Sequence, residues 1–148
     1  VAGNAEAVAA YAAVKDNTDS GQFRAIQKAG AAVLAHPEFT ALAVEKYSRR
    51  LDLLVSALND AGFGAKKPAG TFYCYARAPS GTRGGRRFRN AAEFSDYLIR
   101  EKLVSTVPWD ETGPYVRFSV TFEASSSADE ARIIGDFRER MISAELEF

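Results

Sequence analysis

Cysteine and histidine are scarce in this sequence, with one residue of each type among 148. Cys74 has no second cysteine with which to form an intrachain disulfide, and with His36 it cannot supply the four protein ligands of a structural zinc site. Neither residue has helper residues at the spacing of a catalytic motif, so we expect Cys74 to be a small core residue. The sequence thus predicts no metal site, and the single cysteine favours a reducing, cytoplasmic location.

Charge of one sign and long hydrophobic runs are also missing. Nineteen Lys and Arg residues balance nineteen Asp and Glu residues, so no overall field draws the chain to nucleic acid or to an anionic membrane. Apolar stretches such as residues 29–34 are too short to span a bilayer, and the acidic, Ala-rich start lacks the basic segment of a signal peptide. We therefore expect neither a membrane nor a nucleic acid as partner.

No glycine-rich phosphate motif occurs, since neither G-x-x-x-x-G-K nor G-x-G-x-x-G is present. The glycines at 81, 84 and 85 are interspersed with arginines instead, and these form the one local basic cluster: Arg83, Arg86, Arg87 and Arg89. A solvated surface loop explains such a cluster, and a contact to nucleic acid or phosphate is the alternative. The sequence leaves the role of this loop open.

The remaining composition, 47% hydrophobic and 26% charged, is that of a folded domain with one core. Helical spacing predicts helices over residues 4–15, 23–34, 39–61, from Asn90 to 103, and 129–146. High β-propensity predicts strands over residues 71–76, 104–107 and 115–122. This order indicates an α+β fold, a small mixed or antiparallel sheet covered on one face by helices.

Four connections separate these elements. Residues 16–21 form a polar loop that is expected to cap the helix after it. Pro37 predicts a break at residues 36–38. Residues 79–85 are expected to form a loop too polar to contribute to the core, and residues 109–114 a turn.

Arg117 lies inside the predicted strand over residues 115–122. If the apolar residues at alternate positions from Val116 to Val120 point to the core, Arg117 lies on the opposite face. A guanidinium on a rigid strand presents a planar fork that fits a carboxylate with two hydrogen bonds. The alternative is an exposed strand arginine that pairs with a nearby acid.

Three segments, in the same order along the chain, resemble the C-terminal part of the fold-type I, pyridoxal-phosphate-dependent aminotransferases (class I/II). They read V-K-D-N-T-D-S-G-Q-F at 14–23, G-T-F-Y-C-Y at 70–75 and T-V-P-W-D-E-T-G-P-Y-V-R-F-S-V-T-F at 106–122. The wording of the first and third segments is most similar to LL-diaminopimelate aminotransferases. The resemblance implies the small domain of such an enzyme, amino acid and 2-oxo acid substrates, a homodimer and a place in lysine biosynthesis.

The resemblance also implies roles for individual residues. Arg117 matches the family arginine that binds the α-carboxylate of the substrate. Asn17 and Ser20 match a loop that approaches the neighbouring subunit's active site, where Asn17 would contact substrate and Ser20 the cofactor phosphate. The residues Gly70, Phe72 and Tyr73 match the start of the first small-domain strand, where the aromatics are equally compatible with the core. Trp109 departs from the P-G-x-x-F-G turn of many members.

The Schiff-base lysine of the family lies upstream of the matched region, and no lysine of this sequence has its Ser-Lys setting. We therefore expect a C-terminal fragment, beginning at Val1 instead of Met, that contains no catalytic residue and is inactive alone. Residues 1–37 would be an interdomain and large-domain remainder, and residues 38–148 the small domain. The alternative is a free-standing α+β module that binds a carboxylate ligand or has a regulatory role.

Overall fold

The computed structural model describes residues 2–19 and 21–148. The chain divides into two compact units, of which the first ends at Leu42 and the second spans Ala43–Phe148. This division lies inside a helix, whereas the sequence predicts a boundary after residue 37. Among the described residues, no helix is long and apolar enough to cross a membrane.

The first two helices of the first unit begin in different ways. Helix α1 (Ala5–Asp16) is capped by Asn4, whose side chain accepts hydrogen bonds from the backbone N–H groups of Glu6 and Ala7. Helix α2 (Arg24–Leu34) begins after Phe23 without a side-chain cap, so the prediction that the polar loop caps it is wrong. The loop carboxylate of Asp19 instead accepts from the Lys15 ammonium and the Gly21 N–H.

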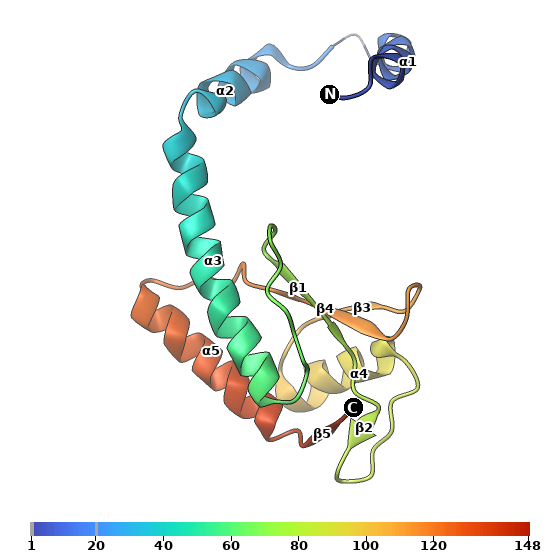
Figure 1. The fold of residues 1–148 in the computed structure, drawn as a ribbon, viewed down its shortest axis with the longest axis vertical. Coiled ribbons are helices and arrows are strands. Elements are labelled where there is room, and N and C mark those ends of the chain that lie inside the picture. The colour runs from blue at the N-terminus through green and yellow to red at the C-terminus, as the bar shows by residue number, and fades with distance from the viewer. Residues whose placement is uncertain (1, 20) are drawn as a thin grey trace. The chain divides into compact units, whose positions relative to one another are not determined.

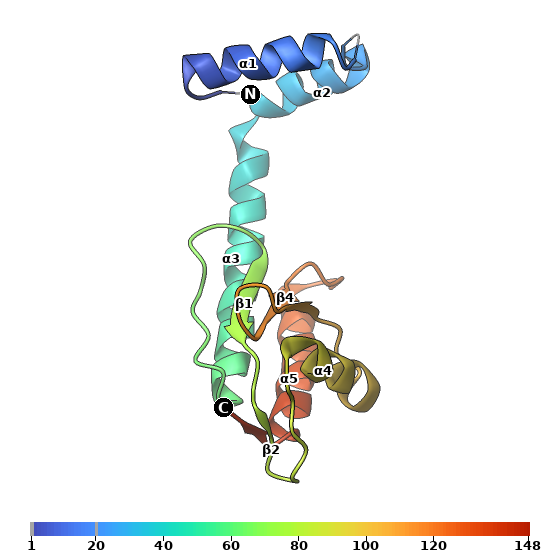
Figure 2. The same ribbon diagram turned by 90° about the vertical axis from the view of Figure 1, so that its right-hand side faces the viewer.

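Helix α3 (Pro37–Asp60) begins at a proline, which is well suited to the first turn because its missing N–H would have no helical partner. The break predicted at residues 36–38 is found at residues 35–36, since residues 37 and 38 already belong to α3. Figures 1 and 2 show α3 beside α5 in the second unit. The other elements of that unit are β1 (Tyr73–Arg77), β2 (Gly81–Thr82), α4 (Ala91–Tyr97) with its π-helical continuation η1 (Leu98–Lys102), β3 (Val107–Trp109), β4 (Tyr115–Ser119), α5 (Ser127–Ile142) and β5 (Leu146–Glu147).

The main sheet is antiparallel with the strand order β1-β4-β3, so β4 is paired on both sides. Strand β3 is an edge strand with Pro108 at its centre. It begins three residues later than predicted, because Leu103 is left-handed (φ 55°) and the Val104 N–H still bonds to Leu98 of η1. Trp109 therefore ends a strand, and the prediction that it begins a turn is wrong.

A second, two-stranded sheet joins β2 to β5. This pairing corrects two predictions, since residues 79–85 do contribute buried positions and the last helix ends at Ile142. Both Gly81 and Thr82 are buried, and a Cβ at Gly81 would collide with the backbone carbonyl oxygen of Arg86. The return of the C-terminal segment onto this loop excludes the fully solvated loop that the composition suggested.

Helices α3, α4 and α5 cover one face of the main sheet, which confirms the α+β prediction (Figure 1). Phe118 of β4 is 3% exposed and makes edge contacts with Phe63, at 5.7 Å between ring centroids, and with Phe137 of α5, at 5.9 Å. Burial of such aromatic side chains supplies much of the stability of a core this size. Among the described residues of the second unit, no helix lies on the opposite face of the sheet (Figures 1 and 2).

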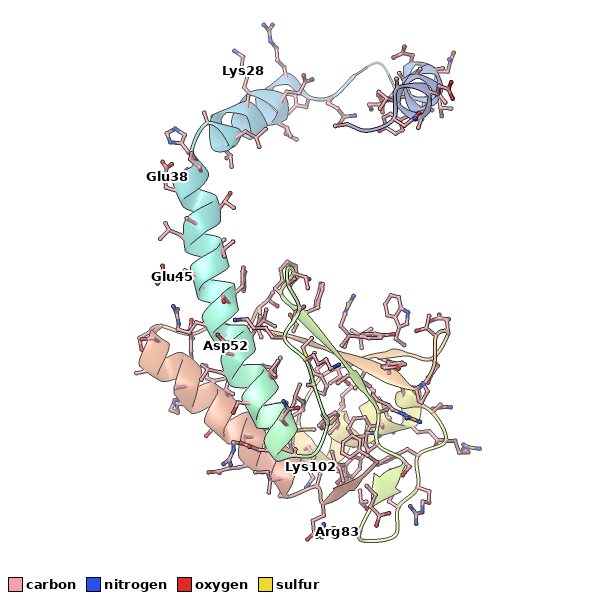
Figure 3. The ribbon with its side chains drawn as sticks, in the orientation of Figure 1. Lys28, Glu38, Glu45, Asp52, Arg83 and Lys102 are labelled. Carbon is pink, nitrogen blue, oxygen red and sulfur yellow. The ribbon has the colours of Figure 1, made fainter. Side chains whose placement is uncertain are left out.

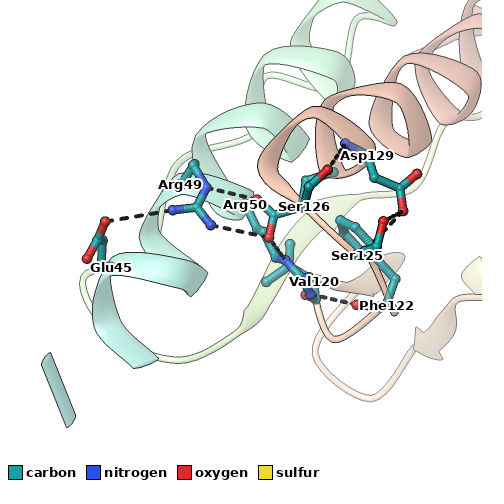
Figure 4. Close-up of polar contacts among 9 residues, drawn as sticks. Glu45, Arg49, Arg50, Val120, Phe122, Ser125, Ser126 and Asp129 are labelled. Atoms are coloured by element: carbon teal, nitrogen blue, oxygen red, sulfur yellow. Dashed lines mark hydrogen bonds and ion pairs between the residues drawn. The ribbon is translucent and has the colours of Figure 1, made fainter. Parts of the chain in front are cut away.

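A buried ion-pair network joins α3, α5 and the segment after β4. Glu130 of α5 accepts hydrogen bonds from Arg49 Nε and Arg50 Nε, each at 2.8 Å. Arg50 also donates to the carbonyl oxygens of Val120, at 3.0 Å, and Phe122, at 2.6 Å; these contacts are drawn in Figure 4. Arg50 is almost fully buried in spite of its charge, because only 1% of it is exposed.

The two guanidinium groups keep Glu130 ionised. Hydrogen bonds from Arg49, and then from Arg50, lower the pKa of Glu130 from 4.5 to about 2, although burial opposes this shift. Every donor of this network that is buried has a partner, and no buried side-chain nitrogen or oxygen is unpaired in the described part of the chain. The network fixes where the polypeptide leaves β4.

Candidate functional site

Arg117 lies at the centre of β4, the middle strand of the main sheet. Its neighbours Val116 and Phe118 are 0% and 3% exposed, so the half-buried Arg117 side chain projects from the opposite face of the sheet, as the alternation predicts. Hydrogen bonds to strands on both sides hold the backbone of this residue in place. The sheet is thus a rigid support for the guanidinium.

Two aromatic rings lie against the guanidinium of Arg117. Its Cζ atom is 4.0 Å from the centroid of the Tyr73 ring and 5.7 Å from that of the Trp109 ring. Tyr75 of β1 and Val107 of β3 lie directly opposite Arg117, which makes Tyr73 and Trp109 its diagonal neighbours. Each edge strand therefore contributes one ring to the surroundings of the cation.

No carboxylate forms an ion pair with Arg117 among the residues described here. Asp110, which follows Trp109, is engaged elsewhere, because its carboxylate accepts from the backbone N–H groups of Ala91, at 2.7 Å, and Ala92, at 3.2 Å. An anion is favoured at such a helix N-terminus. The ion pair between Arg117 and a nearby acid, which is the alternative interpretation, is therefore not found among the described residues.

The same face of the sheet carries a second aromatic pair. The rings of Tyr75 and Tyr115 stack at 4.9 Å between centroids and 10° between planes, and the Tyr75 hydroxyl lies 3.0 Å from Thr112 Oγ1. These rings and hydroxyl groups add no charge to the face. The rings and hydroxyl groups around Arg117 are apolar or neutral, and Arg77 of β1 adds a second cation to this face, an arrangement suited to an organic anion.

The aromatic residues at the start of β1 do not belong to the buried core. Tyr73 is half-buried, and 37% of Phe72 is exposed. The Phe72 ring packs against Tyr73 at 4.5 Å between centroids and against Tyr47 of α3 at 5.6 Å. Gly70 precedes them in the exposed turn, with open space where a Cβ would be. Of these residues, Tyr73 reaches the arginine.

Asn17 belongs to the first unit and Arg117 to the second. Asn17 is the exposed C-cap of α1, and its side-chain amide donates to the Ala13 carbonyl oxygen at 2.8 Å. Ser20 lies outside the described residues. The roles of Asn17 and Ser20 remain predictions from the resemblance.

The arginine cluster of residues 83–89 is largely paired with acids. Arg86 lies 4.0 Å from Glu101 and over the Tyr97 ring. Arg87 pairs with Glu147 at 2.8 Å, and Arg89 pairs with Glu93. The fourth member, Arg83, is labelled in Figure 3. Its backbone N–H donates a hydrogen bond to the backbone carbonyl oxygen of Glu145. Neutralised charges favour a structural surface loop over a nucleic-acid contact.

Cys74 is fully buried, as the sequence predicts, and burial raises the pKa of its thiol. A raised pKa disfavours the reactive thiolate. His36 pairs with Glu38, at 2.7 Å between Nδ1 and Oε1. Across residues 2–19 and 21–148, no three His, Cys, Asp or Glu side chains are placed to hold a metal ion.

No lysine is buried: Lys15 and Lys102 are partly exposed, and the other lysines are exposed. Lys15 pairs with Asp19, whose hydrogen bond raises the pKa of the ammonium, and Lys67 pairs with Asp52 at 2.7 Å. Lys102 donates to Ser143, and Lys28 is exposed on α2; both are marked in Figure 3. A nucleophilic lysine needs the opposite environment, one that lowers its pKa.

Comparison with known protein families gives one match over most of the chain. The model described as aminotransferase class I and II matches residues 1–134. The LL-diaminopimelate aminotransferase of Methanococcus maripaludis is 51% identical over 153 residues, which cover 100% of this chain and 37% of that protein. The protein of the same name from Methanocaldococcus jannaschii is 45% identical, with 99% of this chain and 37% of that protein covered.

Solved structures also match over most of the chain. The substrate-bound BacF structure from Bacillus subtilis has a TM-score of 0.74 at 28% identity, covering 99% of this chain and 35% of that one. An aspartate aminotransferase from Rhizobium meliloti has a TM-score of 0.58, also at 28% identity, over 74% of this chain and 28% of that chain. The present chain thus spans little more than a third of the length of the curated relatives that it matches.

Proposed function

Because this chain belongs to the aminotransferase class I and II family, we propose that it supplies the binding site for the substrate α-carboxylate in an LL-diaminopimelate aminotransferase. Arg117 carries the proposal, since its guanidinium is held on the central strand without a carboxylate partner in the described chain. A guanidinium binds a carboxylate through two parallel hydrogen bonds. Such binding orients the α-carbon of the substrate for reaction.

Enzymes of this family depend on pyridoxal phosphate, which serves as an electron sink for the amino acid carbanion. The lysines described above do not fit the attachment site of this cofactor, because none is buried and Lys15 and Lys67 pair with acids. In our proposal the chain binds and orients substrate, and the attachment lysine belongs to the part of the relatives' length that this chain does not span.

Three further features of the proposal rest on the family. The substrates are an amino acid and a 2-oxo acid, and LL-diaminopimelate as donor would place the enzyme in lysine biosynthesis. The enzyme is a homodimer in which Asn17 contacts substrate, and Ser20 the cofactor phosphate, of the neighbouring subunit. Residues 38–148 are the small domain, and residues 1–37 belong to the interdomain and large-domain side.

The proposed activity is tested with the full-length protein that contains this chain. We expect it to transfer an amino group from LL-diaminopimelate to a 2-oxo acid, followed as the amino acid formed from the acceptor. The diaminopimelate isomer with the opposite configuration at both α-carbons is the control donor, because with its α-carboxylate held in the same place the amino group and the Cα hydrogen exchange positions. Equal rates with both donors, or no transfer from LL-diaminopimelate, would refute the proposal.

The 148-residue chain alone is expected to form no stoichiometric covalent adduct with pyridoxal phosphate. Its lysine ammonium groups are solvated or paired with acids, so no lysine has the buried setting that favours attack on the aldehyde. Visible absorption after mixing, followed by borohydride reduction and mass spectrometry, measures the adduct. One lysine labelled to completion would show that the chain contains an attachment site.

A further inference from the structure

We infer that Tyr73 and Trp109 are positioning residues that hold the Arg117 guanidinium for the substrate carboxylate. The inference rests on the proposed function, since it takes Arg117 as the group that binds this carboxylate. The two rings, referred to below as the aromatic clamp, lie 4.0 Å and 5.7 Å from Arg117 Cζ. Both distances are within the range, up to about 6 Å, over which an aromatic face attracts a cation.

The aromatic clamp contacts the guanidinium of Arg117 through ring faces and forms no hydrogen bonds with its N–H donors. A ring attracts the flat face of the group, whereas the five N–H donors point outward in its plane. No carboxylate of the described chain pairs with these donors. An acidic partner would also hold Arg117 in place, but it would occupy the donors that a bidentate carboxylate needs. Aromatic contacts therefore position the cation without competing with the ligand.

Arg50 of the same unit shows the contrasting arrangement. Its guanidinium also lies over an aromatic ring, 4.4 Å from the centroid of Phe122, but its donors are bonded to Glu130, Val120 and Phe122. Arg50 is 1% exposed, whereas Arg117 is half-buried on the face of the sheet opposite to the core. The first arginine has its donors used inside the protein, and the second retains them for a ligand.

The Tyr73 ring is itself held in place from behind. Phe72 packs against it at 4.5 Å between centroids, and Phe72 in turn packs against Tyr47 of α3 at 5.6 Å. No hydrogen bond involves the Tyr73 hydroxyl within the described chain, where the backbone N–H of Tyr73 bonds to Thr71. The ring face, and not the hydroxyl group, is thus the part of Tyr73 that acts on Arg117.

The test measures steady-state kinetics of the full-length enzyme with four single variants. We expect Tyr73→Leu and Trp109→Leu to lower kcat/KM for the amino acid about three- to ten-fold, mainly through KM. Tyr73→Phe should retain wild-type values, because it keeps the ring face. Tyr97→Leu is the matched control, since the Tyr97 ring lies over the guanidinium of a different arginine, Arg86. The inhibition constant of a carboxylic acid without an amino group should follow KM in every variant.

A double-mutant cycle separates the clamp from the proposed function. If the aromatic clamp acts through Arg117, Tyr73→Leu has no further effect on kcat/KM in an Arg117→Ala background. Loss of activity in Arg117→Ala together with wild-type kinetics in Tyr73→Leu would overturn the clamp alone. If Tyr73→Leu lowers kcat/KM by the same factor in the wild-type and Arg117→Ala backgrounds, Tyr73 has a structural role and the clamp is also overturned. Wild-type kinetics in Arg117→Ala would overturn the proposed function itself.

Discussion

Replacing Arg117 by lysine is expected to lower kcat/KM of the full-length enzyme for its amino acid about ten-fold to a hundred-fold, and replacement by alanine further. Lysine keeps the positive charge but has no planar fork, so one of two parallel hydrogen bonds to the carboxylate is lost. Hydrogen bonds to charged groups contribute about 1.5 to 3 kcal/mol, and about 1.4 kcal/mol corresponds to a factor of ten. Steady-state kinetics with varied amino acid measure the loss.

Arg77→Lys provides the control for this substitution, because Arg77 is an exposed residue of the neighbouring strand β1 and faces the same side of the sheet. We expect that variant to keep the wild-type kcat/KM. The melting temperature should change little in Arg117→Ala, since no ion pair of the described chain depends on this side chain. Normal turnover with a lowered melting temperature would make Arg117 a structural residue and exclude the carboxylate assignment.

Replacing Glu130 by glutamine is expected to lower the free energy of unfolding of the 148-residue chain by about 3 to 5 kcal/mol. The Arg50 guanidinium, 2% exposed as a side chain, would then be buried without an anion. Urea unfolding followed by circular dichroism measures the change. Glu139→Gln on the same helix is the control, because Glu139 is exposed, and its effect should stay within about 0.5 kcal/mol. Equal effects of the two substitutions would show that the network contributes little to stability.

The same carboxylate makes stability depend on pH. Because folding lowers the pKa of Glu130 from 4.5 to about 2, the folded state binds fewer protons than the unfolded state between these values. The contribution of Glu130 is therefore fully present above pH 4.5 and is lost as the pH falls towards 2. In Glu130→Gln this part of the acid dependence should disappear, which urea unfolding at several pH values measures.

The sequence predicts those features that depend on local rules. Asn4 and Asn90 accept hydrogen bonds from the first turns of α1 and α4, as their side chains suggest. Alternation along 115–122 places Arg117 opposite the core, because side chains of a strand alternate between faces whatever the strand pairs with. The identity of the groups around Arg117 needed the register of β1 and β3, which local patterns do not contain.

Some of the predictions that are wrong concern partners distant in the sequence. Residues 79–85 look like a free loop because their partner, β5, lies more than sixty residues later. Arg50 looks like a surface residue because it is charged, and charged residues are rarely buried without a partner. A spacing signal existed, however. Tyr47, Arg50 and Leu54 follow one another at steps of three and four residues, which places Arg50 on the apolar stripe.

Strand β3 has a consequence for self-association of the chain. As an edge strand, it exposes backbone groups with which a strand of another molecule can pair. It contains only three residues, however, and the central one, Pro108, has no N–H to donate. A continuous ladder of hydrogen bonds to a second copy cannot form along this edge. The β3 edge of the sheet is therefore protected against intermolecular strand addition, the first step of ordered β-aggregation.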